Sequence, residues 1–250
     1  MATYNFTESF DRNSLFYITR NFSKVFKNPR GCNEKELKGI LTSLRYYLKS
    51  SNEDGTINIS YSQKSYGFGR LYANLNALQN MPCDIRNAIA NKYVNDYDVV
   101  KAHPVILKHI CSTKNISCPM LTDYVENREE WLVNIYPESR ADSKTTIIRL
   151  MYGGDVPSNV SYQKIIEFHS ELRNITIALS GFSENKKFVK IAMDKRYNQE
   201  GSFLSYLLQD MENKILRQCI SYCTTQNIRI HSLIYDGFTA NIDDTIDFLN

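Results

Sequence analysis

The sequence predicts an α+β protein, because two different hydrophobic periods occur along its 250 residues. Strict alternation, typical of a strand with one buried face, occurs at Ile57, Ile59 and Tyr61. Apolar residues at helical spacing dominate the middle, 120–200, and the later segment 202–225. The hydrophobic content of 42% suits one globular body with a sizeable core.

The first half of the chain is expected to mix helices and strands. Residues 34–49 carry Leu and Ile at helical spacing behind Asn33, a suitable N-cap. A polar turn then leads into the strand around Ile59, and Gly67 and Gly69 follow where the backbone must bend or be approached closely. Three further elements are predicted in this half: a helix at 84–91, a strand at 93–100 and a helix at 103–111.

The second half is predicted to be mainly helical and to end in a hairpin. Gly153, Gly154 and Pro157 supply a stop after one of the helices. The predicted helices are 120–134, 139–152, 163–179 and 202–225. The predicted hairpin has strands at 228–235 and 238–242, with a turn at Asp236-Gly237.

The charge is uneven along the chain. Its net value is only +3, but residues 1–50 hold nine Lys and Arg against four Asp and Glu. A basic N-terminal arm of this kind could follow a phosphate backbone, or it could be a solvated helix face. No apolar run is long enough for a membrane span, no signal peptide is evident, and the six cysteines form no CxxC pair. We therefore expect a soluble intracellular protein with free thiols that is not secreted and not bound to a membrane.

Two carboxylates are candidate metal ligands. Asp98 and Asp236 lie 138 positions apart, each at the end of a β-prone run that could be adjacent to the other in one sheet. Such a pair could hold two Mg²⁺ ions that clamp the oxygens of a phosphoryl transfer. The alternative is that Asp236 only forms an Asp-Gly turn.

A second candidate lies on the predicted helix 139–152. Four-residue steps place Arg140, Lys144, Ile148 and Tyr152 along one stripe. Two cations in series suit a triphosphate, and an aromatic end suits a base. The alternative is an ordinary surface helix with a packed end.

Four segments, taken together, are similar to one known family. Residues 55–82 match its first segment without a gap at Gly55, Tyr61, Gln63, Gly69, Arg70, Leu71, Leu78, Gln79, Asn80 and Pro82, with Ile85-Arg86 after them. Motif A of the family is resembled by the stretch from Asp98 to Pro104. Motif B is resembled by the set Arg140, Lys144, Tyr152 and Gly153, and motif C by Tyr235-Asp236-Gly237. The chain thus resembles the polymerase core of family A DNA polymerases, the group of bacterial DNA polymerase I. It departs from the family where His103 replaces a Glu, where Ile148 replaces an aromatic residue, and where the residues flanking Asp236 differ.

The resemblance implies a role for each matched residue. Asp98, Asp236 and Lys144 would be catalytic, and Asp98, Asp236 and the carbonyl of Val99 would bind two Mg²⁺ ions, for which Mn²⁺ could substitute. The residues implied to bind the nucleotide are Arg140, Lys144, Ile148, Tyr152 and His103. Those implied to bind the primer-template are Arg70, Gln79, Asn80, Arg86 and Gly153.

The resemblance also implies an architecture, a right-hand polymerase palm with an antiparallel sheet, helical fingers and a reduced helical thumb. The expected division is thumb 1–54, first palm part 55–104, fingers 105–200 and second palm part 201–250. At this size no exonuclease domain is expected, and the chain would be either compact or part of a longer protein. A viral or phage source, in a bacterial cytoplasm or an infected host cell, would suit it.

The implied function is a template-dependent nucleotidyltransferase, a DNA-directed DNA polymerase that extends a primer. Its partners would be a DNA primer-template and nucleoside triphosphates, with replication proteins or further domains of a longer chain. Two alternatives stay open at this point. One is a primase or DNA-directed RNA polymerase of the same fold, and the other is a catalytically silent palm that binds nucleic acid.

Overall fold

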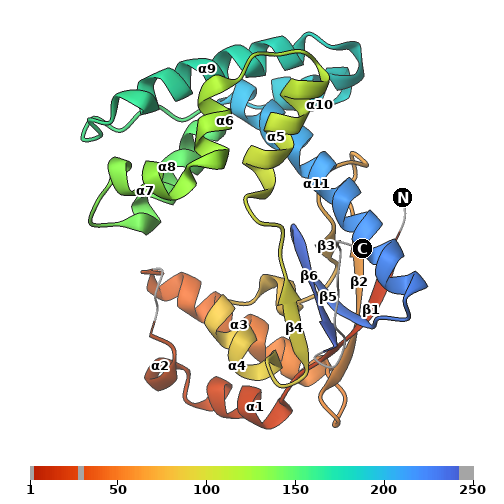
Figure 1. Ribbon diagram of the computed structural model, residues 1–250. Coiled ribbons are helices and arrows are strands. Elements are labelled where there is room, and N and C mark those ends of the chain that lie inside the picture. Colours follow the sequence, from red (N-terminus) through yellow and green to blue (C-terminus); the bar gives the residue numbers. More distant parts are fainter. Residues whose placement is uncertain (1–2, 28–30, 242–250) are drawn as a thin grey trace. The chain divides into compact units, whose positions relative to one another are not determined.

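The computed structural model describes residues 3–27 and 31–241, which form two compact units (Figure 1). Unit 1 contains the chain up to Val99 together with the part from Asn213 on, and unit 2 contains Val100–Glu212. Helices dominate, and the described strands form two small antiparallel sheets. The predicted α+β class is therefore confirmed, whereas the assignment to palm, fingers and thumb, with its four-part division, stays a prediction.

The first sheet of unit 1 has the order β1-β2-β3. Its strands are β1 (Tyr4–Ser9), β2 (Thr56–Ser62) and β3 (Tyr72–Ala73). Strand β2 carries the alternation seen in the sequence, with Ile57, Ile59 and Tyr61 buried. It pairs along its length with β1, a strand that the sequence analysis did not predict.

The second sheet of unit 1 has the order β4-β6-β5. Its strands are β4 (Val94–Tyr97), β5 (Ile230–Ile234) and β6 (Gly237–Asn241). The hairpin β5-β6 confirms the predicted strand pair, except that the predicted end at Ile242 lies outside the described residues. The central strand β6 is apolar and buried at Phe238 and Ala240, which suits a strand with neighbours on both sides.

Unit 1 also contains helices that differ widely in length. They are α1 (Arg12–Arg20), α2 (Phe22–Val25), α3 (Glu34–Ser50), the 3₁₀ helix η1 (Leu78–Asn80), α4 (Cys83–Ala90) and the last part of α11 (Gln199–Thr225). Asn33 caps α3 as predicted: its side chain accepts from the Glu36 N–H at 3.0 Å, and the Glu36 carboxylate accepts from the Asn33 N–H at 2.8 Å. At α1 the side chain of Asp11 caps the helix by accepting from the Ser14 N–H at 2.9 Å.

A buried carboxyl group lies at the centre of unit 1. Glu8 is 0% exposed and accepts hydrogen bonds from Tyr47 Oη at 2.8 Å, Tyr61 Oη at 2.7 Å and the Leu78 N–H at 3.0 Å. These donors come from α3, β2 and η1, so one side chain joins three elements to β1. Burial outweighs the three hydrogen bonds and raises the pKa of Glu8 from 4.5 to about 7.

Unit 2 is wholly helical in its described elements. These are α5 (Ala102–Thr113), α6 (Pro119–Glu126), α7 (Arg128–Ile135), α8 (Arg140–Met151), α9 (Gln163–Ser180), the 3₁₀ helix η2 (Ser183–Asn185), α10 (Lys186–Met193) and the first part of α11. Trp131 is fully buried, with its ring 5.3 Å from Phe168 and 5.6 Å from Tyr124. The single helix predicted at 120–134 is wrong, because Asn127 leaves helical geometry and separates α6 from α7.

None of the described helices combines the length and the apolar character that a membrane crossing requires.

The raised pKa of Glu8 predicts a stability that depends on pH. The folded protein keeps a proton that the unfolded chain releases, so this stabilisation is present below pH 4.5 and is lost as pH rises towards 7. As pH rises across this window, the unfolding free energy of wild type should fall by about 3 kcal/mol. The Glu8→Gln variant should lack this fall, because its side chain does not titrate. Urea unfolding of both proteins at pH 5 and pH 8 measures the difference. Parallel pH profiles would contradict the assignment.

Candidate functional site

The strand register of the second sheet brings the two predicted aspartates to adjoining strand ends. Tyr97, the last residue of β4, pairs with Phe238 of β6. Asp98 directly follows β4, and Asp236 directly precedes β6. A Cβ placed on Gly237 would lie 2.3 Å from the Tyr97 carbonyl oxygen and 3.1 Å from the Asp98 Cα. The backbone segments that carry the two carboxylates are therefore in close contact within unit 1, and their role as metal ligands stays a prediction.

The turn that holds Asp236 differs from the predicted one. Ile234 pairs with Gly237, so the two turn residues are Tyr235 and Asp236, and the predicted Asp236-Gly237 turn is wrong. Tyr235 takes the left-handed conformation, with φ of +58°, where a bulky side chain is uncommon. The Arg70 guanidinium lies 5.2 Å from the centre of the Tyr235 ring and covers it. Unusual backbone of this kind clusters at functional sites.

The electrostatics around Asp98 involve a third carboxylate. Asp96 lies in β4, two residues before Asp98, and is close enough for the charge of Asp98 to act on it. Burial raises the pKa of Asp96; Arg86, 3.8 Å from its carboxylate, opposes this rise, and the charge of Asp98 adds to it. Arg86 thus lies beside the acidic strand end. In the described part of the chain, no three His, Cys, Asp or Glu side chains are grouped to hold a metal ion.

Three other predicted residues of unit 1 have different surroundings. Gln79 is buried: its amide donates to the carbonyls of Leu71 and Leu233 at 3.1 Å, and its oxygen accepts from the Ala73 N–H at 3.0 Å. It ties the two sheets together, and its implied contact with a primer-template stays a prediction. Asn80 is exposed, and Val99 is half-buried.

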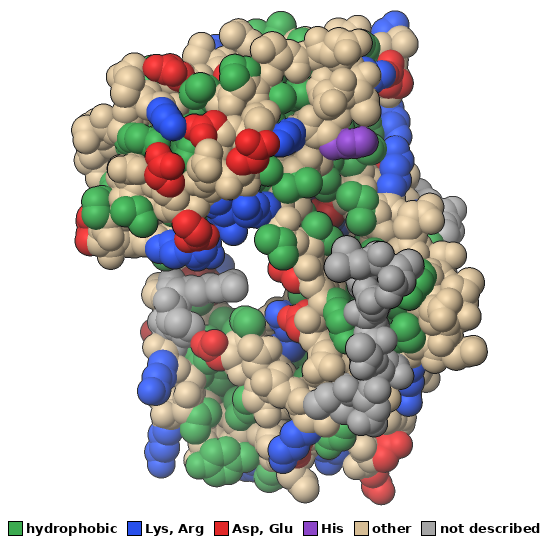
Figure 2. Space-filling model, in the orientation of Figure 1, with side chains coloured by type: hydrophobic (Ala, Val, Ile, Leu, Met, Phe, Trp, Pro, Cys, Tyr) green, Lys and Arg blue, Asp and Glu red, His purple; other side chains and the backbone are tan. Residues whose placement is uncertain are grey.

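A cluster of cations lies at the start of α8 in unit 2. The Arg140 guanidinium makes a two-pronged contact with Glu129, with N–O distances of 2.9 and 2.6 Å. Lys144 follows one turn later, and its pKa is lowered by burial and then by the charges of Arg140 and Arg128. The described chain offers no acceptor to the buried Nε of Arg128. Figure 2 shows Lys and Arg side chains gathered over α7 and α8.

At the far end of the predicted stripe, one side chain is exposed to solvent and the next is partly packed. Ile148 is 56% exposed, so it is not covered in this unit. Tyr152 is half-buried, and its carbonyl accepts from the Asn198 amide at 2.8 Å. Gly153 turns the chain after α8 with φ of +74°. Gly201 of α11 then approaches so closely that a Cβ there would lie 2.0 Å from the Tyr152 oxygen.

His103 belongs to a buried polar group that the sequence did not reveal. Its Nε2 lies 2.6 Å from the Glu212 carboxylate, and its Nδ1 is hydrogen-bonded to the Tyr152 hydroxyl. Glu212 is 2% exposed, so its carboxyl group is removed from water and has His103 as a hydrogen-bond partner. The signal that could have found Glu212 is the acid-amide run Asp210, Glu212 and Asn213 inside the strongly apolar α11.

Each unit therefore contains side chains that could bind a different kind of ion. In unit 1, exposed Asp98 and half-buried Asp236 can supply carboxylate oxygens to a hard divalent cation. In unit 2, the cluster of Arg128, Arg140 and Lys144 can bind phosphate oxygens.

The contact at Gly237 predicts a sharp cost for a small change. In Gly237→Ala the new Cβ must displace the Tyr97 carbonyl, so we expect a loss of roughly 2 kcal/mol or more in unfolding free energy. The matched control is Gly39→Ala in the exposed part of α3, where nothing lies within 4 Å; it should stabilise the helix by about 1 kcal/mol. Chemical unfolding measures both, and equal stabilities would contradict the close approach.

Comparison with known proteins finds a relative in a virophage. No protein-family model matches the sequence. The chain is similar to "Putative helicase V13" of Sputnik virophage, with 30% identity over 208 residues. The match covers 77% of this chain and 27% of the relative, so the chain spans about a quarter of that protein's length.

This relative corrects the function expected from the sequence. A DNA-directed DNA polymerase was implied by the spacing of three motifs, but the similar protein carries the name of a helicase. The predicted polymerase function is therefore wrong. The resemblance in motif spacing to family A polymerases stays a prediction about those residues alone.

Proposed function

We propose that this chain is part of a viral, nucleic-acid-acting enzyme of the helicase-like class, and that it binds a nucleic-acid strand. The observation that carries the proposal is a sequence match to a virophage protein named as a helicase. The match covers 77% of this chain at 30% identity. The 250 residues contain no Gly-x4-Gly-Lys-Ser/Thr run, the loop that cradles nucleotide phosphates in many helicase motors. The proposal therefore concerns strand and cation binding by this chain.

The cation cluster of α7 and α8 supports strand binding. Phosphate contacts from Lys and Arg supply most of the affinity of proteins for nucleic acids, whatever the sequence. Arg140 and Lys144 lie one helical turn apart, and Arg128 adds a third charge. Glu129 occupies the Nε and one Nη of Arg140, so a phosphate would contact the guanidinium N–H groups that Glu129 does not use. Exposed Ile148, one turn beyond Lys144, offers an apolar surface to a base.

The carboxylate pair of unit 1 supports divalent cation binding. Mg²⁺ is commonly held by one or two carboxylates and completes its shell with waters and phosphate oxygens. Asp98 and Asp236 fit such a site as a pair, with the Val99 carbonyl as a further oxygen close by in sequence. Mn²⁺ can take the same ligands. The cation would neutralise two carboxylates that otherwise repel a phosphate backbone.

Strand binding is tested by removing two charges from the cluster. We expect Arg140→Gln with Lys144→Gln to weaken binding of fluorescein-labelled oligothymidine roughly tenfold at low salt. The slope of log affinity against log salt should fall by about 1.4, since each lost phosphate contact on a single strand contributes about 0.7. Fluorescence anisotropy at several salt concentrations measures both.

The matched control removes two lysines at the same spacing from another helix of unit 2. Lys186 and Lys190 are exposed on α10, one turn apart. Lys186→Gln with Lys190→Gln makes the same change in net charge and should leave the affinity within about twofold of wild type. Equal losses in the two double variants, or no binding by wild type, would refute the proposed mode of binding.

Cation binding is tested separately, by calorimetric titration with Mn²⁺. We expect Asp98→Asn and Asp236→Asn each to weaken binding tenfold or more, because each removes a charged oxygen ligand from a pair. The control is Asp84→Asn, an exposed carboxylate in the first turn of α4, which should bind Mn²⁺ as wild type does. Wild-type affinity in the double variant Asp98→Asn with Asp236→Asn would exclude this pair as the site.

A further inference from the structure

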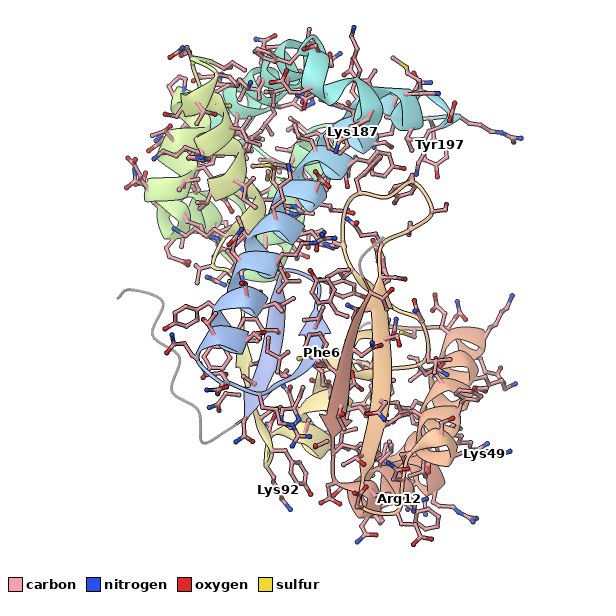
Figure 3. The ribbon with its side chains drawn as sticks, turned by 90° about the vertical axis from the view of Figure 1, so that its right-hand side faces the viewer. Phe6, Arg12, Lys49, Lys92, Lys187 and Tyr197 are labelled. Carbon is pink, nitrogen blue, oxygen red and sulfur yellow. The ribbon has the colours of Figure 1, made fainter. Side chains whose placement is uncertain are left out.

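A basic cavity lies between α1 and α3 in unit 1, apart from the carboxylate pair of that unit. Its volume is about 440 Å³, and it is open to solvent. Four of its seven lining residues are cations, and none is acidic: Arg12 and Arg20 come from α1, Arg45 and Lys49 from α3. Figure 3 labels Arg12 and Lys49, which lie at the same end of the unit.

Helix geometry explains why the four charges converge. Arg12, Phe16 and Arg20 lie at four-residue steps on α1, and Arg45 and Lys49 lie at one such step on α3. Residues four apart lie on the same face of a helix. The two faces meet at the cavity, so the charges that the sequence spreads over 38 positions, from Arg12 to Lys49, are brought around one space. This space accounts for four of the nine cations in residues 1–50.

The positive charge of the cavity is uncompensated within the described chain. No described carboxylate forms a salt bridge with any of its four cations. Cations elsewhere often have such partners, for example Arg140 with Glu129, Lys108 with Glu126 and Lys114 with Glu184. Like charges around one cavity repel each other and destabilise the fold unless an anion is bound. The arrangement is therefore better suited to holding a ligand than to supporting the fold.

Arg12 gives a second, independent indication of a ligand. Its Nε is buried, and no acceptor in the described chain reaches it. A buried N–H without an acceptor costs about 1–3 kcal/mol, so such groups in folded proteins normally have a partner. Among the described residues this donor has none. A bound anion in the cavity that Arg12 lines would provide the acceptor.

The remaining lining residues add an aromatic surface. Phe16 is 49% exposed, and the Arg20 guanidinium lies 5.3 Å from the centre of its ring. An exposed ring beside several cations is the combination that proteins use to hold a nucleic-acid base and its phosphate together. Leu48 of α3 supplies a further apolar contact. A simple inorganic anion would use the cations and leave this surface bare.

We infer that the cavity between α1 and α3 binds phosphate groups, and that these belong to a nucleic-acid strand. The inference rests on the proposed function for the identity of the ligand, and on the cavity alone for its phosphate chemistry. It places a second contact for the strand in unit 1, in addition to the cation cluster of α7 and α8.

The test uses the full chain and two phosphate probes, fluorescein-labelled oligothymidine and inorganic tripolyphosphate. Arg45→Gln with Lys49→Gln removes two cavity cations that are exposed on α3, so the fold should be kept. The control, Lys35→Gln with Lys38→Gln, removes two exposed cations from the same helix outside the cavity. We expect the cavity variant to bind oligothymidine roughly tenfold more weakly, with a salt slope lower by about 1.4, and the control to bind as wild type. Arg12→Gln should weaken binding in the same direction.

The two probes separate failure of the cavity from failure of the proposed function. If wild type and the cavity variant bind oligothymidine equally well, the cavity is not a strand site, and the proposed function stands. If wild type binds only tripolyphosphate and the cavity variant loses it, the cavity is a phosphate site, but strand binding is refuted. If wild type binds neither probe, both proposals are overturned. Equal losses in the cavity variant and the control would show an unspecific effect of charge and also overturn the site.

Discussion

Unit 1 depends on the hydrogen bonds that the buried carboxyl group of Glu8 accepts. Its three donors come from α3, β2 and η1, and one of them, the Leu78 N–H, fixes the short helix η1. The next residue of η1 is Gln79, which bonds to Leu71 before β3, to Ala73 within it and to Leu233 of β5. The position of the hairpin that carries Asp236 thus depends on a carboxyl group in the other sheet. A buried network of this kind is strongly cooperative, because leaving any member unpaired is costly.

Only some of the elements that this network joins could be predicted from the sequence. The helix 34–49 and the strand around Ile59 were predictable because their apolar spacing and the Asn33 cap act locally. Strand β1 was missed because Glu8 occupies a core position, so the pattern of apolar residues stops where burial is deepest. A fully buried charge-bearing residue is rare unless paired, and its partners here lie 39 to 70 positions away. No local pattern contains such information.

The candidate sites also differ in whether local sequence signals could reveal them. Asp98 and Asp236 could be placed in one sheet because strand ends and turns have local signals, although the turn itself is shifted by one residue. The partner of His103 could not be predicted, since Glu212 lies 109 positions away inside an apolar helix. The basic cavity also required the structure, because only the packing of α1 on α3 brings its charges together. Function was the least predictable level: motif spacing indicates which residues gather, whereas different reactions can use the same residue types.

The backbone of Tyr235 carries a consequence for engineering of this protein. A glycine at φ of +58° would relieve about 1 kcal/mol of backbone strain. It would also remove the ring that lies under Arg70 next to Asp236, a contact worth about 0.5–1 kcal/mol. The strain of this turn is thus largely offset by the contact that the tyrosine makes. Replacement by glycine should therefore change thermal stability little, while it leaves the turn that carries Asp236 more mobile.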